Sequence, residues 1–205
     1  MAGNVFLNCP FDDQYDPIFK AVVFAVHACG FTLRCAKESS GTESVRIEKI
    51  ITMIRECEFG IHDLSRVDTL GKLPRFNMAL ELGIFIGARS FGGKPQKGKK
   101  FFVLEGRSKQ YHQTLSDISG QDPGCHNNTP EEAVKEVRKW LSDQVDKNPG
   151  VPGKDRIMLL YGQFRELLPG LLDVSGQDEG SMTFRELREC VQQFLDAQVP
   201  SPASS

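Results

Sequence analysis

The sequence has no long hydrophobic run and no surplus of basic residues. Its longest fully apolar stretches, such as Ala21–Val26, are far shorter than the roughly 20 residues that a membrane-spanning helix needs. Lysine and arginine total 25 against 27 aspartates and glutamates, for a net charge of −2. The basic excess that neutralises nucleic-acid phosphates is therefore missing. We expect neither a membrane nor a nucleic acid as a partner.

The sequence also lacks paired cysteines. No C-x-x-C pair occurs, and no histidine stands at zinc-ligand spacing from a cysteine, which argues against a metal site and a disulfide framework. No basic and apolar leader precedes Val5. We expect a reduced, cytoplasmic protein without a metal or a bound cofactor. The six scattered thiols are those of Cys9, Cys29, Cys35, Cys57, Cys125 and Cys190.

What is present is a globular composition, 40% apolar and 25% charged, in which short apolar segments alternate with amphipathic ones. Strands are expected at 5–7, 31–36, 58–62 and 101–104, with helices at 18–29, 47–54 and 76–88 between them. This alternation predicts an α/β fold with a doubly wound parallel sheet, flavodoxin-like, in the order 2-1-3-4 with a possible fifth strand. The helix at 76–88 is apolar on most sides, which predicts deep packing.

The second half of the chain is predicted to be helical. Thr129, Pro130 and the glutamates after them favour a helix start, and Thr183 with Glu186 forms a capping box. We expect an α/β nucleotide-binding domain at 1–147, a helical hairpin at 154–197 and a frayed tail at 198–205. The hairpin is too small for a core of its own, so its apolar stripes predict docking on the sheet or a homo-oligomer contact.

Glu81 is the sharpest candidate for a functional residue. It lies in the apolar segment 78–86, where a carboxylate costs several kcal/mol unless it is paired or hydrogen-bonded. Asn77 lies four residues earlier on the same helical face and can reach it. Gly83 and Gly87 suggest close packing or close approach of a ligand. A position on a narrow exposed stripe of the helix, or a structural salt bridge, remains the alternative reading of Glu81.

Further candidates follow the first and third expected strands, because ligands of open α/β sheets bind outside the carboxyl ends of the strands at the switch point. Asp63 ends the third strand and could orient a ribose hydroxyl or fix an Asx-turn. Asn8, Pro10 and Phe11 form the exit of the first strand. Phe11 could stack on a base or plug the core.

Other patterns are weaker. The histidines at 62, 112 and 126 lack metal-ligand spacing, so structural roles are expected for them. The stretch 173–184 departs from a calcium loop, because Asp178 stands at the glycine position and Phe184 at the final glutamate position.

Three motifs together resemble the nucleoside 2-deoxyribosyltransferase-like superfamily and, more distantly, the prokaryotic TIR-type NAD hydrolases. They are the strand motif 5–11, ending Asn-Cys-Pro-Phe, the motif Ile-His-Asp-Leu at 61–64, and the helical segment 75–83, which contains Glu-Leu-Gly. The resemblance covers residues 4 to 127. It implies attack at the anomeric carbon of a nucleoside or nucleotide, with Glu81 as nucleophile or oxocarbenium stabiliser and Asp63 in contact with sugar or base.

The chain departs from the family's pattern at three positions. Asn77 stands near a position where the transferases carry another aspartate, Cys9 replaces a glycine, and Phe6 stands near a tyrosine that orients the nucleophile. NAD-type substrates need less leaving-group assistance, because nicotinamide departs as a neutral base.

Whether the chain is an enzyme stays open at this stage. The leading hypothesis is N-glycosidic-bond cleavage of NAD or a related nucleotide, of the kind used in bacterial antiviral defence. One alternative is a non-catalytic nucleotide-sensing module that controls a partner or an oligomer. The other is a nucleoside deoxyribosyltransferase or hydrolase.

Overall fold

A computed structural model describes residues 3–38, 45–65, 75–107, 115–118, 122–144, 150–175 and 182–198. Of the predicted features, His112, residues 176–181 of the stretch 173–184 and residues 199–205 of the tail lie outside the described residues. The strands are β1 (Asn4–Asn8), β2 (Thr32–Cys35), β3 (Phe59–Asp63), β4 (Lys100–Glu105) and β5 (Gly124–Cys125). The helices are α1 (Asp16–Ala28), α2 (Arg46–Glu56), α3 (Phe76–Phe91), α4 (Pro130–Ser142), α5 (Lys154–Ser175) and α6 (Phe184–Ala197), with short 3-10 helices η1 (Lys94–Gln96) and η3 (Ser116–Ile118).

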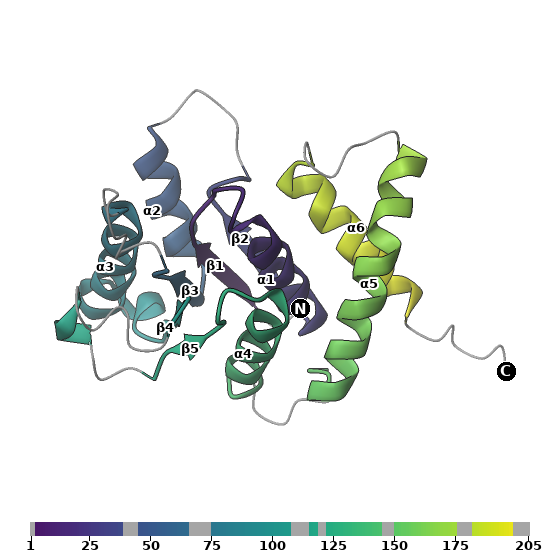
Figure 1. Cartoon of the computed structure of the whole chain (residues 1–205). Helices are drawn as coiled ribbons and strands as arrows, with labels where there is room; N and C mark the ends of the chain where they lie inside the picture. The colour runs from purple at the N-terminus through teal and green to yellow at the C-terminus, as the bar shows by residue number, and fades with distance from the viewer. Residues whose placement is uncertain are drawn as a thin grey trace, which may run out of the picture.

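The five strands form one parallel sheet in the order β2-β1-β3-β4-β5 (Figure 1). The expected α/β fold and strand order are confirmed, and β5 is the fifth strand. Val5 pairs with Leu33 on one side and with Phe59 on the other. Side chains of β1 and β3 are buried on both faces of the sheet, as a sheet covered by helices requires.

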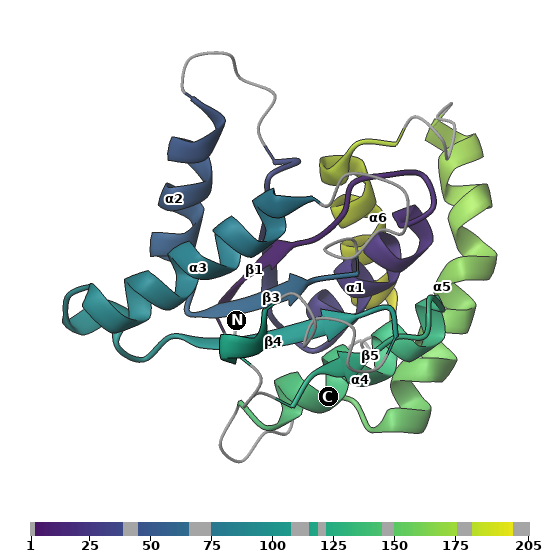
Figure 2. The ribbon, with the colours of Figure 1, turned by 60° about the vertical axis from the view of Figure 1, so that its left-hand side comes forward.

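Helices cover both faces of the sheet (Figure 2). α2 and α3 pack together on one face, and α1 and α4 on the other. α5 and α6 form a further layer against α1, where Phe24 stacks on Phe164 with ring centroids 5.2 Å apart. The apolar stripes of the predicted hairpin therefore pack within the chain, in one continuous core with α1 and α4.

Several local signals act as the sequence predicts. Thr183 accepts a hydrogen bond from the Glu186 amide and Glu186 accepts one from the Thr183 amide, which completes the capping box of α6. α4 begins at Pro130, but the Thr129 side chain donates back to the carbonyl of His126 at 3.1 Å and does not cap the helix. Among the described residues no helix is long and apolar enough to cross a membrane.

The packing predicted for α3 is wrong on one side. Only Met78, Glu81, Leu82 and Phe85 of this helix are buried. A Cβ added to Gly83 or Gly87 would meet no atom within 4 Å, so close packing within the chain does not account for the glycines. The sequence shows that α3 is apolar on most sides, but it does not show which sides of the helix are covered.

Candidate functional site

The side chains at the carboxyl ends of the central strands form a buried polar cluster. Asp63, at the end of β3, is fully buried, and its carboxylate accepts three hydrogen bonds and lies beside the His126 ring. Oδ2 accepts from the Tyr15 hydroxyl at 2.7 Å and lies 3.0 Å from His126 Nε2. Oδ1 accepts from the Ser65 amide at 2.9 Å and the Ser65 hydroxyl at 2.5 Å. Asp63 thus fixes the exits of β1, β3 and β5 relative to one another.

Ser65, His126 and Asp63 do not form a hydrolytic triad. The Asn128 amide donates to His126 Nδ1 at 3.1 Å, so Nε2 carries the ring proton of the neutral imidazole. Ser65 Oγ and Asp63 Oδ2 both lie 3.0 Å from that same Nε2. A general base needs a free lone pair facing the serine, with the carboxylate on the other ring nitrogen. The cluster therefore holds the strand exits together and does not activate Ser65.

The backbone after β5 adopts an uncommon conformation beside this cluster. Asn127 and Asn128 both have positive φ, 51° and 56°, in the left-handed region that asparagine tolerates better than most residues. This double turn brings the Asn128 amide to His126 and leads the chain directly into α4. A β-branched residue at either position would strain the turn.

Asn8 connects β1 to the helix that carries Glu81. Its side chain is buried, and its amide nitrogen donates to the carbonyl of Met78 at 2.8 Å and lies 3.1 Å from His62 Nδ1. Burial lowers the pKa of His62 to about 3, so the ring is neutral and Nδ1 accepts the bond. Asn8 therefore positions the first turn of α3 through a buried structural contact.

Glu81 has a different environment from Asp63. It lies on the inner side of α3, is 6% exposed, and has no hydrogen-bond or ion-pair partner among the described residues. Burial raises the pKa of its carboxyl to about 7, and the charge of Arg46, at the start of α2, opposes this rise. The reach of Asn77 to Glu81 is not observed, because Asn77 is exposed and no bond joins the two side chains among the described residues.

Glu81 and Asp63 lie within electrostatic range of the same buried thiol. The pKa of Cys9 is raised well above its usual value, first by burial and then by the charges of Cys35, Asp63 and Glu81, which Lys37 opposes. The exits of β1 and β3 and the inner face of α3 therefore face a common region, where the strand order places the switch point.

The remaining predicted residues line the exit of β1. Pro10 is buried, and Phe11 packs edge-on against Phe19 with ring centroids 5.7 Å apart. Lys37 Nζ lies 5.3 Å from the Phe11 ring and 4.5 Å from the Phe19 ring. These contacts favour the reading of Phe11 as part of the core.

Sequence reasoning missed several residues of this region. Arg75 pairs with Asp12 at 3.3 Å and so joins the start of α3 to the loop after β1. Tyr15, Ser65 and His126 complete the environment of Asp63. The one available signal was a polar residue close after a strand: His126 directly follows β5, and Ser65 stands two residues after the end of β3. Tyr15 carries no such signal.

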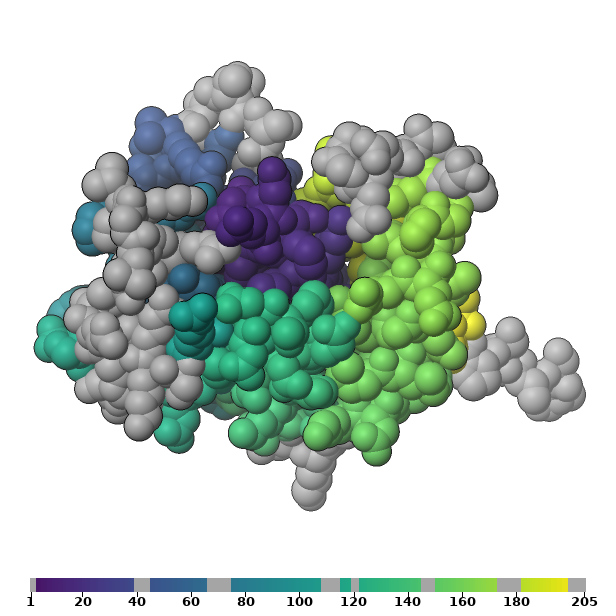
Figure 3. Space-filling model, in the orientation of Figure 1, coloured from purple at the N-terminus to yellow at the C-terminus, as the bar shows by residue number. Residues whose placement is uncertain are grey.

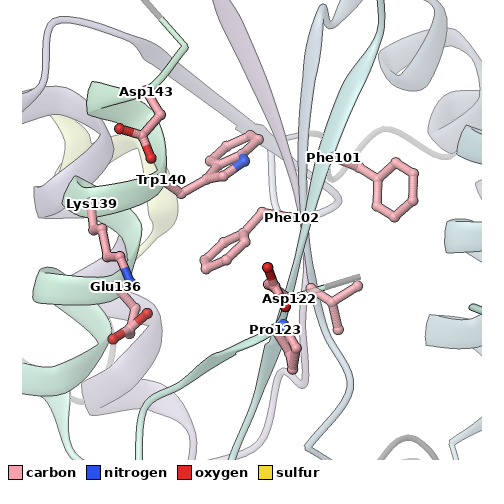
Figure 4. A pocket seen from close by; sticks show the side chains of 9 residues that line it. Phe101, Phe102, Asp122, Pro123, Glu136, Lys139, Trp140 and Asp143 are labelled. Atoms are coloured by element: carbon pink, nitrogen blue, oxygen red, sulfur yellow. The ribbon is translucent and has the colours of Figure 1, made fainter. Parts of the chain in front are cut away.

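A separate cavity of about 290 Å³ lies between β4 and α4. Phe102 and Trp140 stack inside it, with ring centroids 5.3 Å apart and planes 7° from parallel, and Phe101 points to the other side of β4 (Figure 4). Asp122, Glu136 and Asp143 line its rim with Lys139. None of the residues predicted for the site lines this cavity.

The described residues contain no cluster of three or more histidine, cysteine, aspartate or glutamate side chains that could hold a metal ion. All six cysteines are free thiols, four of them buried. Comparison with known proteins gave no match to a family model and no match to a curated protein.

Proposed function

We propose that the chain cleaves the N-glycosidic bond of NAD or a related nucleotide, with Glu81 facing the anomeric carbon. The observation that carries the proposal is the contrast between two carboxylates beside the same strand exits. Asp63 accepts three hydrogen bonds and lies 3.0 Å from His126 Nε2, whereas Glu81 has no hydrogen-bond or ion-pair partner among the described residues. An unpartnered, nearly buried carboxylate on a rigid helix is costly for folding alone and suits an electron-deficient reaction centre.

The chemistry follows from the charges. The C1′–N bond of NAD breaks with both electrons going to the nicotinamide nitrogen, which neutralises the pyridinium cation. The ribosyl carbon becomes oxocarbenium-like, and water then adds to C1′ and loses a proton. An ionised Glu81 stabilises the developing positive charge, or bonds to C1′ before water does. The cationic substrate also favours ionisation of the carboxyl, since an opposite charge nearby lowers its pKa.

Other residues position this carboxylate. Asn8 holds the first turn of α3 through Met78, and the Arg75–Asp12 pair holds the start of the helix. Asp63 acts on the strand exits and not on the sugar, because its oxygens already accept three hydrogen bonds and contact His126. The resemblance to the deoxyribosyltransferase-like superfamily supports the assignment of Glu81, and the environment of Asp63 changes the role that the resemblance implies for it.

The test is to incubate the chain with NAD, nucleosides and cyclic nucleotides and to separate the products by chromatography. We expect release of nicotinamide or a free base by the parent, loss of release by Glu81→Gln, and parental release by Glu166→Gln, which removes an exposed carboxylate from α5. Turnover by Glu81→Gln at the parental rate would refute the proposal. Exchange of bases between two nucleosides would identify a transferase.

A second candidate, the nucleotide-sensing module, is favoured by one observation. Asp63 is fully occupied and Asn77 has no acidic group, so among the predicted residues Glu81 is the one carboxyl without bonds. A site whose one unbonded carboxyl is that of Glu81 can bind a nucleotide without cleaving it. Retention of an unchanged nucleotide by the parent, with no product after long incubation, would support this candidate over the glycosidase.

A further inference from the structure

Helix α3 has two apolar faces, of which the protein covers one. Met78, Leu82 and Phe85 point into the core. About half a turn away around the helix, Phe76 is 69% exposed, Leu80 56% and Phe91 91%. Gly83 and Gly87 lie between them on the same side, because residues at spacings of three and four share one face of a helix. We call these five residues the outer face of α3.

The main apolar faces of helices α5 and α6 are covered within the chain. Phe184, Leu187, Val191 and Phe194 of α6 are buried, as are Ile157, Leu160, Phe164 and Leu168 of α5. The exposed leucines of α5, at 159 and 167, lie among polar, charged and glycine residues. α3 lies on the side of the molecule away from α5 and α6 (Figures 1 and 2), and Figure 3 shows α5 and α6 gathered at the opposite end.

The outer face has a shape that complements itself. A Cβ on Gly83 or Gly87 would meet nothing within 4 Å, so the two glycines form an open notch between large side chains. If two copies of α3 pair antiparallel about a twofold axis between residues 83 and 84, Leu80 of one copy lies opposite Gly87 of the other. Phe76 then lies opposite Phe91. Glycines four residues apart also let two helices approach closely.

We propose that the outer face of α3 is the twofold interface of a homodimer, with a second copy of this chain as its occupant. A phenylalanine side chain carries ~150–250 Å², so the outer face supplies roughly half of the ~800 Å² per partner that a stable interface buries. Two further apolar side chains are exposed on or next to α2, which packs beside α3: Val45 just before the helix and Ile51 within it. A twofold interface needs one patch that complements itself. The large side chains of the outer face and the open notch at its two glycines provide such a patch.

The proposal is independent of the glycosidase assignment. Glu81 lies toward the core side of α3, at 6% exposure, so pairing through the outer face does not cover it. Dimerisation would fix the helix that carries Glu81 from its solvent side, while Asn8 and Arg75 hold its first turn from within.

The first experiment measures molar mass by sedimentation over a range of micromolar concentrations. We expect a dimer for the parent, a rise in Kd of about tenfold or more for Leu80→Asp, since the carboxylate would be buried against the partner, and parental behaviour for Leu167→Asp. Leu167 is 54% exposed on α5 and so matches Leu80 in type and exposure. A monomeric parent, or equal dissociation of the two variants, would overturn the proposal.

The second experiment tests the geometry by mild oxidation. Gly83→Cys should form a disulfide-linked dimer rapidly, because the axis brings the two copies of this residue together. Gly162→Cys is the matched control, since Gly162 is also an exposed helical glycine with nothing within 4 Å of an added Cβ. The parent measures background from the native thiols. Equal cross-linking of the two variants, or binding of a monomeric parent to phospholipid vesicles through α3, would count against a homodimer.

Discussion

The Tyr15 hydroxyl donates a hydrogen bond of 2.7 Å to Asp63 Oδ2 across 48 residues of sequence. It joins the turn before α1 to the end of β3, and both groups are buried. The bond therefore defines the spacing between the exits of two neighbouring strands, where the site is proposed. It is one of the three hydrogen bonds that the buried Asp63 carboxylate accepts.

Tyr15→Phe should lower the free energy of unfolding by about 1–2 kcal/mol, because a buried acceptor loses one donor while the ring stays packed. Urea denaturation monitored by the fluorescence of Trp140 measures this change. Tyr161→Phe removes the same atom from α5, where the hydroxyl makes no hydrogen bond to a described residue, and should cost less. An equal cost for the two variants would show that the Tyr15–Asp63 bond adds little.

Asn8→Asp should be more damaging than Asn8→Ala. Alanine removes the donor to Met78 and His62, at a cost of about 1–3 kcal/mol, whereas an ionised aspartate places a buried negative charge against a carbonyl oxygen. Unfolding free energies at pH 5 and pH 8 separate the two effects: the Asp variant should recover part of its loss at the lower pH. A loss independent of pH in the Asp variant would argue against a buried charge.

Glu81 should make stability depend on pH with a defined sign. Its pKa is raised from an ordinary 4.5 to about 7 in the folded chain, so the folded state binds the proton more tightly than the unfolded state. This contribution is full below about pH 4.5 and is lost as pH rises through about 7. Glu81→Gln should therefore match the parent near pH 4.5 and exceed it by about 2–3 kcal/mol at pH 8. Parallel curves for the parent and the variant from pH 4.5 to 8 would contradict this.

Turnover should show the opposite trend. If the ionised carboxylate stabilises the oxocarbenium-like centre, the rate at low substrate concentration rises with pH through about 7, the pKa of Glu81 in the free protein. Measuring kcat/KM for nicotinamide release from pH 5.5 to 8.5 provides the test. A rate that falls over this range would instead assign Glu81 as a general acid.

The sequence predicted the sheet well because its strands and helices carry local signals. Apolar segments such as Phe59–His62, separated by amphipathic helices, are sufficient to predict a parallel sheet. The capping box of Thr183 and Glu186 can be recognised because both residues lie within four positions of each other. The environment of Asp63 could not be predicted, because Tyr15, Ser65 and His126 meet through the fold and no spacing relates them. The outer face of α3 shows the same limit, since periodicity reports where apolar residues lie and not what covers them.

Alanine substitutions at two glycines, one buried beside His62 and one exposed, test how tightly the core around His62 is packed. A Cβ on Gly60 of β3 would lie 2.8 Å from His62 Nε2 and 2.8 Å from the Phe85 ring, and both groups are fully buried. Gly60→Ala should therefore destabilise the fold by about 1–3 kcal/mol through overpacking and displace the α3 face that holds Phe85. Gly162 is exposed on α5, and a Cβ added there would meet nothing within 4 Å. Gly162→Ala should therefore stabilise the fold by about 0.5–1 kcal/mol, because alanine loses less backbone entropy in a helix. Unfolding free energies that move in opposite directions would confirm that the packing behind α3 is rigid, whereas a neutral Gly60→Ala would mean that His62 and Phe85 can shift to admit a methyl group.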